Sequence, residues 1–161
     1  MYRLVLLVVL LVISANADEE ADKEGTASLA KGWGNAITWE KTYGEALRKM
    51  VESKKPLMVI HHLEECEHSK ALKKVFADDS TIQKMAKDDF IMLNIVEETT
   101  DKNMAPDGYY VPRILFVDPS LTVRTDIMGR YSNAHYVYEP LDLKLLAENM
   151  KKAKLLIHEE L

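Results

Sequence analysis

The chain has 161 residues, 47% of them hydrophobic and 29% charged, and carries a formal net charge of −5. This length suits one domain with its own core and leaves little room for a second. The mildly acidic balance, without a lysine or arginine cluster, argues against binding to nucleic acid or to anionic membrane surfaces.

Residues 1–17 have the pattern of a secretory signal peptide. Arg3 precedes an apolar run over residues 4–13, and residues 15–17 form a small-residue cleavage site before Asp18. A membrane anchor would need roughly 20 apolar residues, so we expect no membrane insertion. The acidic stretch over residues 18–31 is expected to be a disordered tail, and the folded domain to span residues 32–161.

Apolar spacing predicts alternating helices and strands along this domain. We expect a helix over residues 42–55, where Thr42 and Glu45 match a capping box, and then a buried strand over residues 56–63. The elements expected next are one helix over residues 66–89, a buried strand over 90–98, two strands over 111–120 and 121–131, and a closing helix over 141–161. This order predicts an α/β fold with a mixed central sheet covered by helices on both faces.

Cys66 is the only cysteine, so no disulfide can form within the chain and stability must come from packing. The predicted strand runs into this cysteine at the start of the predicted helix. Unpaired N–H groups and the positive end of the helix dipole stabilise a thiolate at such a position. A protonated His68 would favour that thiolate, whereas Glu64, Glu65 and Glu67 would oppose it.

Ser69 occupies the place that the second cysteine holds in a Cys-x-x-Cys redox pair. Its hydroxyl can donate a hydrogen bond to the Cys66 sulfur, but it cannot resolve a mixed disulfide. Cys66 could therefore capture a client, isomerise one slowly or link two chains, which makes the protein at most a weak thiol–disulfide isomerase. The alternative is a cysteine that only packs at a helix start, because free cysteine is often buried.

Four residues near this position are of the types that bind zinc, namely His61, His62, Cys66 and His68. Neighbouring residues on a strand point to opposite faces, and positions 66 and 68 lie about 200° apart on a helix. Three ligands would not converge in this arrangement. We therefore expect no metal, and nothing in the sequence indicates another cofactor.

The chain ends in His158, Glu159, Glu160 and Leu161, which is close to the K-D-E-L type of retention signal of the endoplasmic reticulum. Glu159 stands where that signal has aspartate. Together with the signal peptide, this ending predicts a protein of the endoplasmic reticulum lumen that is partly secreted.

Several stretches resemble, in the same order, the anterior gradient proteins, small members of the protein disulfide isomerase group. They are GWGNAITW, TYGEALRK, KPLMVIHHLEEC, HSKALKKVFA, YVPRILFVDPSLTVR and GRYSN. The resemblance covers residues 32–161 and implies a thioredoxin-like fold. It also implies that Val111 and Pro112 form the cis-proline loop that faces the cysteine and presents backbone to an extended client. Glu67 departs from the family, whose cysteine motif is C-P-H-S.

The resemblance implies a homodimer as well, because Glu45 and Lys49 match an acid and a lysine that pair across two subunits. The same two residues are four positions apart and could instead pair within one helix.

Two functions remain open. The first is a folding factor of the disulfide isomerase type in the endoplasmic reticulum, which holds secretory clients such as cysteine-rich mucins through Cys66. The second is a secreted ligand that acts on cell-surface receptors in growth, differentiation or regeneration. In a third interpretation the thiol is inert and the surface of the domain does the binding.

Overall fold

The computed structural model describes residues 28–159, and side chains up to residue 155. The predicted signal peptide, most of the predicted acidic tail, and Glu160 and Leu161 lie outside the described residues. The described elements are the helices α2 (Tyr43–Ser53), α3 (Glu67–Asp78), α4 (Ser80–Asp89) and α5 (Leu143–Glu159), the strands β1 (Leu57–His61), β2 (Ile91–Ile95) and β3 (Arg113–Val117), and the short 3₁₀ turns η1 (Lys102–Met104) and η2 (Pro140–Asp142).

A three-stranded sheet in the order β2-β1-β3 forms the centre of the domain. β1 is parallel to β2 and antiparallel to β3, so the sheet is mixed as expected. All five residues of β1 and all five of β3 are buried, which explains the apolar runs over residues 57–60 and 114–117 in the sequence.

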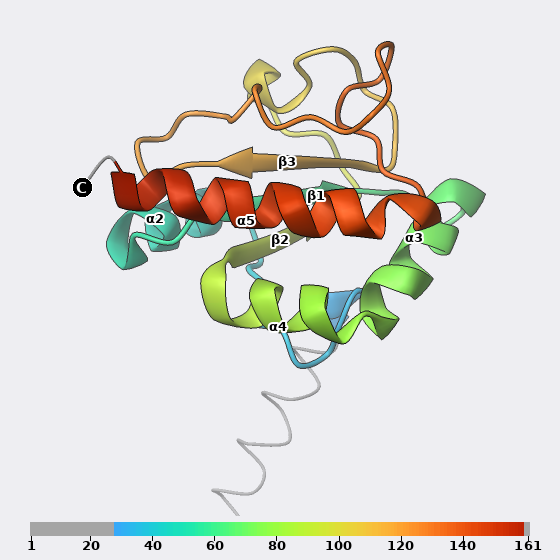
Figure 1. The fold of residues 1–161 in the computed structure, drawn as a ribbon, viewed down its shortest axis with the longest axis horizontal. Coiled ribbons are helices and arrows are strands. Elements are labelled where there is room, and N and C mark those ends of the chain that lie inside the picture. The colour runs from blue at the N-terminus through green and yellow to red at the C-terminus, as the bar shows by residue number, and fades with distance from the viewer. Residues whose placement is uncertain (1–27, 160–161) are drawn as a thin grey trace, which may run out of the picture.

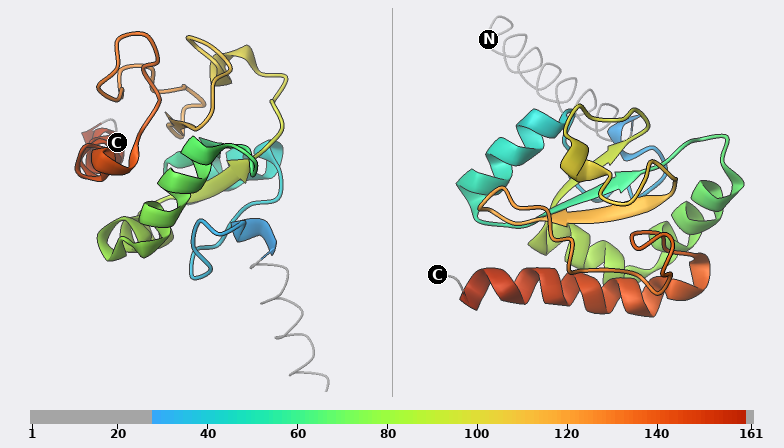
Figure 2. Two further views of the ribbon diagram at one scale, coloured as in Figure 1. Left: turned by 90° about the vertical axis from the view of Figure 1, so that its right-hand side faces the viewer. Right: turned by 90° about the horizontal axis from the view of Figure 1, so that it is seen from above.

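Helices cover both faces of this sheet, with α2 on one face and α5 on the other (Figures 1 and 2). Side chains alternate between the two faces along each strand. The core on the α2 face includes Ala46, Met50, Leu57, Val59, Leu93, Leu115 and Val117. The core under α3, α4 and α5 includes Met58, Ile60, Leu72, Phe76, Ile82, Phe116, Leu146 and Met150.

The single helix expected over residues 66–89 is two helices. Asp79 lies between α3 and α4 in an extended conformation, with φ −83° and ψ 107°. Its carboxylate accepts a hydrogen bond from the backbone N–H of Ile82 at 2.8 Å, which starts α4 as a new helix. The prediction failed because both helices are amphipathic and the break inserts neither glycine nor proline.

The strand expected over residues 121–131 is wrong. Val123 forms one isolated bridge with Val117, and the chain then turns where the N–H of Ile127 donates to the carbonyl of Arg124. Leu121 has a positive φ of 68°, which also interrupts an extended chain. The described sheet therefore ends at β3.

Candidate thiol site

Cys66 is the residue that caps the N-terminus of α3. It lies in an extended conformation, with φ −78° and ψ 119°, and its carbonyl accepts from the N–H of Lys70 at 3.0 Å. β1 ends at His61, so a short loop carries the chain from the sheet to the cysteine. The thiol is partly exposed, as a chemical role requires.

The pKa of the Cys66 thiol is held below its ordinary value, chiefly by the effect of the Ser69 backbone N–H in the first turn of α3. The Ser69 hydroxyl and the backbone N–H of His68 act in the same direction, while partial burial and the charge of Glu67 oppose them. The groups at the helix start outweigh the charge of Glu67, so their net effect is to stabilise the thiolate form of Cys66.

Ser69 is 1% exposed and contacts both ends of the loop that carries the cysteine. Its hydroxyl accepts a hydrogen bond from the N–H of Leu63 at 3.3 Å and also helps to lower the pKa of the Cys66 thiol. The serine therefore ties the loop before the cysteine to the first turn of α3, although it cannot attack a disulfide.

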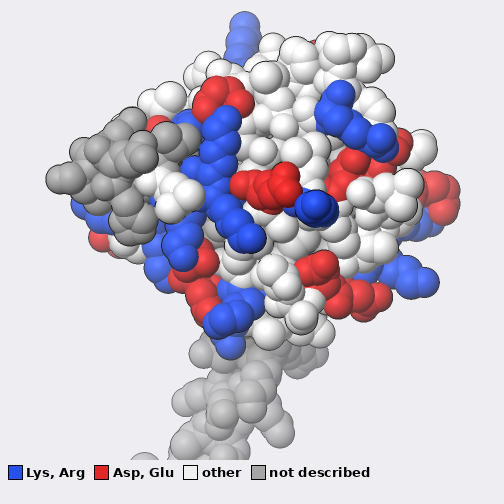
Figure 3. Space-filling view, viewed as in Figure 1, with Lys and Arg blue, Asp and Glu red and all other residues white. Residues whose placement is uncertain are grey.

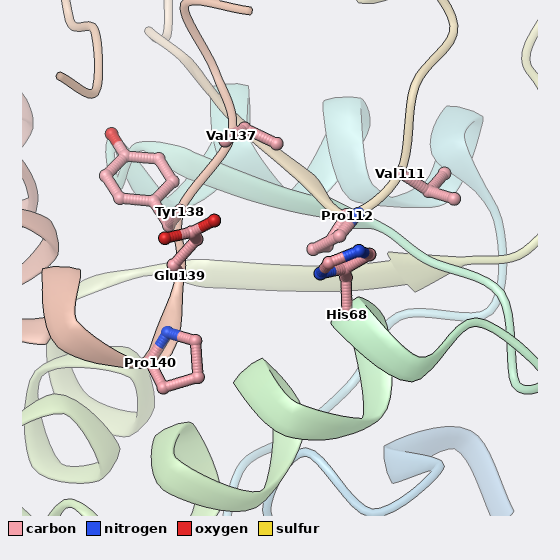
Figure 4. A pocket seen from close by; sticks show the side chains of 7 residues that line it. All are labelled: His68, Val111, Pro112, Val137, Tyr138, Glu139 and Pro140. Carbon is pink, nitrogen blue, oxygen red and sulfur yellow. The ribbon is translucent and has the colours of Figure 1, made fainter. Parts of the chain in front are cut away.

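The Val111–Pro112 peptide bond is cis, as the resemblance implies. Pro112 and Val111 line an open pocket of about 200 Å³ together with His68 at the start of α3 and the segment Val137, Tyr138, Glu139 and Pro140. Figure 4 shows His68 beside Pro112 and the other segment opposite them. The pocket thus joins the first turn of the cysteine helix to the cis-proline loop.

Hydrogen bonds connect the two chain segments that line this pocket. The Tyr110 hydroxyl donates to Asp107 at 2.6 Å and accepts from the N–H of Tyr136 at 3.0 Å. Asp107 also accepts from the N–H of His135 at 2.7 Å, and the N–H of Ile114 donates to the carbonyl of Tyr136 at 2.9 Å. The pocket walls are therefore fixed relative to each other.

His61, the last residue of β1, and His62, the first residue of the following loop, contact different neighbours. His62 lies 3.4 Å from the Asn94 amide oxygen and packs edge-on against Trp33, whereas Nδ1 of His61 lies 3.2 Å from Arg113. Among the residues described, no three histidine, cysteine or acidic side chains form a group that could hold a metal ion.

Burial and the nearby Arg113 guanidinium together lower the pKa of His61 to about 3, against the Glu98 carboxylate, which acts to raise it. Burial also lowers the pKa of His62, against the hydrogen bond with Asn94. Both histidines are therefore neutral at physiological pH, and neither provides a charge near the thiol.

The predicted dimer contact lies on α2. Within the chain, Lys49 forms an ion pair with Glu40 at 2.8 Å. This contact takes the place of the intrahelical pair with Glu45 that the spacing of the two residues would allow. Glu45 donates its backbone N–H to the Thr42 hydroxyl at 3.2 Å, so Thr42 caps α2 as the sequence predicts. The retention-like ending is described only through His158 and Glu159, which continue α5.

Arg113 and Glu98 are the residues of this region that sequence reasoning missed. Arg113 is completely buried and binds Glu98 through both guanidinium ends. The sequence feature that could have indicated a role for Arg113 is its position directly after Pro112 and inside an apolar run.

On the molecular face shown in Figure 3, basic and acidic side chains are interspersed. In the part of the chain that the structure describes, none of the helices is both long and apolar enough for a membrane span.

Comparison with known proteins identifies the family. Residues 38–119 match a family model described as thioredoxin-like. The chain is 60% identical to anterior gradient protein 3 of Homo sapiens over 97% of this chain and 95% of that protein. It is 62% identical to the human anterior gradient protein 2 homolog over 83% and 76%, and 54% identical to anterior gradient protein 1 of Xenopus tropicalis over 92% and 81%. The chain belongs to the anterior gradient family and has its thioredoxin-like fold.

Proposed function

We propose that this protein captures secretory client proteins as mixed disulfides through Cys66, as a folding factor of the disulfide isomerase type. The observation that carries the proposal is the partly exposed thiol at the N-terminus of α3, where Ser69 and the backbone N–H of His68 hold its pKa below the ordinary value. A thiolate is the form that attacks disulfides, and this one is partly exposed.

The reaction is a thiol–disulfide exchange without net oxidation. The Cys66 thiolate attacks one sulfur of a client disulfide, a new sulfur–sulfur bond forms, and the second client sulfur leaves as a thiolate that takes up a proton. A client thiolate later attacks the mixed disulfide, forms a client disulfide and returns Cys66 to its starting state. Because Ser69 has no thiol, release depends on the client, and the captured state is long-lived.

The pocket at the first turn of the cysteine helix would give the client a place to bind before exchange. Its lining is mostly apolar, from Val111, Pro112, Val137 and Pro140, and it opens at the first turn of α3 through His68. An extended client segment on the cis-proline loop would place one side chain in this pocket and its disulfide at Cys66.

The proposed site of action is the lumen of the endoplasmic reticulum, with some protein secreted. Support comes from the signal-peptide pattern of residues 1–17 and from the ending His158 to Leu161. We further propose a homodimer through α2, where Glu45 and Lys49 lie on exposed or half-exposed positions.

The proposal is tested with a synthetic peptide that contains one internal disulfide. The peptide is incubated with the reduced protein, the reaction is quenched with acid, and intact masses are measured. The wild type should gain the full mass of the peptide, and Cys66→Ser should gain nothing while unfolding at the same temperature. Failure of the wild type to form the adduct would refute the proposed chemistry.

A further inference from the structure

Arg113 is the first residue of β3, directly after the cis-proline, and its side chain is 0% exposed. The four residues after it in β3 are all apolar and buried. An arginine is expensive at such a position, because a buried charge must recover its lost hydration through partners. Its contacts therefore indicate what the residue does.

The guanidinium of Arg113 binds the loop that leads into the cis-proline. Nε donates to the carbonyl of Met104 at 3.0 Å, and Nη1 donates to the carbonyl of Tyr110 at 3.1 Å. The Tyr109 ring also lies over the guanidinium, 5.9 Å from its centroid to Cζ. One side chain thus holds both ends of residues 104–110.

The same guanidinium reaches the ends of the other two strands. Nη1 donates to Glu98 at 2.9 Å and Nη2 binds the second oxygen of that carboxylate, just past β2. Nη2 also lies 3.2 Å from Nδ1 of His61, the last residue of β1, which is paired with Arg113 in the sheet. Because this nitrogen accepts from the guanidinium, neutral His61 carries its proton on Nε2.

Contacts continue from the end of β1 to the thiol. Two residues after His61, the N–H of Leu63 donates to the Ser69 hydroxyl at 3.3 Å, and Ser69 lies in the first turn of α3, directly after the N-cap residue Cys66 and the two residues that follow it. The cluster of Arg113, Glu98 and His61 therefore lies between the cis-proline loop and the loop that carries the cysteine.

We propose that Arg113 is a positioning residue for client capture, which fixes the cis-proline loop against the Cys66 loop through Glu98, His61 and the carbonyls of residues 104 and 110. The proposal rests on the function proposed above. A planar fork of five N–H donors is suited to several partners at once, and lysine offers only a single ammonium in its place.

The decisive variant is the double substitution Arg113→Met with Glu98→Gln, which removes the pair without leaving a buried charge unpaired. Arg113→Lys is the second variant, because it keeps a cation beside Glu98 but cannot make all the contacts. An ion pair on α4, Lys84 with Asp88 at 2.7 Å, provides the control double substitution Lys84→Met with Asp88→Asn.

Three measurements are made on each folded variant: the rate of adduct formation with the disulfide peptide, the rate of iodoacetamide alkylation, and amide hydrogen exchange over residues 104–112. In the double variant we expect about ten-fold slower adduct formation, alkylation within two-fold of wild type, and faster exchange in that loop. Arg113→Lys should show the same pattern to a smaller degree, and the control pair should match wild type.

Unchanged adduct formation and unchanged loop exchange in both Arg113 variants would overturn the positioning role. If the double variant does not fold, Arg113→Lys decides alone by the same comparison. If the wild type forms no adduct, the proposed function fails, whereas loop exchange still decides whether Arg113 holds the cis-proline loop.

Discussion

At the scale of single residues, the reactivity of Cys66 is set by its nearest neighbours in the chain. Backbone and hydroxyl groups of Ser69 and the N–H of His68 favour the thiolate, and the Glu67 carboxylate opposes it. Glu67 is the first residue of α3, pairs with Lys70 at 2.8 Å, and has a largely exposed side chain. Its effect on the sulfur is therefore modest and easily tested.

Replacing Glu67 with proline should lower the pKa of the Cys66 thiol and speed iodoacetamide alkylation at pH 7 by roughly two-fold. The substitution removes a negative charge, and proline is well tolerated at the first position of a helix. Glu67→Gln, which removes only the charge, is the matched control and should give most of the gain. Equal or slower alkylation in both variants would show that the helix start alone controls the thiol.

His61 makes a pH-dependent contribution to stability. Its pKa lies at about 3 in the folded protein, whereas an unfolded chain takes up this proton near pH 6.5. Stability is therefore lost as the pH falls below about 6.5, by about 2 kcal/mol between pH 7 and pH 5.

His61→Asn should remove that loss, since asparagine offers Arg113 an acceptor in a similar place and does not titrate. Urea unfolding of both proteins at pH 7 and pH 5 measures the difference. The same loss of stability in wild type and variant would contradict the assignment to His61.

At the scale of elements, the sequence allowed β1, α2, β2, β3 and α5 to be predicted because their signals are local. Buried strands appear as short apolar runs, and a cap or an apolar stripe marks each helix. The break at Asp79 was missed because one aspartate serves equally well inside a helix or as a cap. The expected fourth strand failed because a β-rich composition near Val123 does not show where the chain turns away.

In the candidate site, too, some residues could be predicted from the sequence and others could not. The sequence allowed Cys66, His68 and Ser69 to be placed together, because all three lie at one helix start. Arg113 could not be assigned, because its partners His61 and Glu98 lie 52 and 15 residues away. Contacts of this kind depend on the register of the sheet, which sequence patterns do not specify.

The proposed homodimer would form through the exposed face of α2. If Glu45 pairs with Lys49 of a second copy, Glu45→Lys alone should weaken the dimer, and Glu45→Lys with Lys49→Glu should restore much of it. The structure adds that Lys49→Glu also removes the partner of the buried Glu40, so the double variant should be less stable even where it dimerises. Sedimentation and thermal unfolding separate the two effects. Identical dimerisation in every variant would exclude these residues from the interface.

At the scale of the whole molecule, a folded thioredoxin-like domain is combined with two proposed targeting signals. These are the signal peptide over residues 1–17 and the retention-like ending over residues 158–161. α5 extends to Glu159, so the first two residues of the retention-like ending, His158 and Glu159, belong to the last helix of the domain. A receptor must read those final residues as a free end.

Deleting residues 158–161 should move most of the protein from cells to the medium without changing its unfolding temperature, because the described core lies before these residues. Replacing the ending with K-D-E-L should instead reduce the secreted share below that of wild type. The measurement is the ratio of medium to cell-associated protein for the three forms. Three equal ratios would show that the ending is not read as an address.

The most direct test of the account is the trapping of natural clients in secreting cells. Cells expressing wild type, Cys66→Ser or Ser69→Cys are treated with acid and an alkylating agent, and complexes with each form are separated on non-reducing gels and identified by mass. We expect disulfide-linked clients with the wild type, none with Cys66→Ser, and far fewer with Ser69→Cys, because a second thiol would resolve the mixed disulfide. Equal client complexes with wild type and Cys66→Ser would contradict the claim that this thiol captures clients.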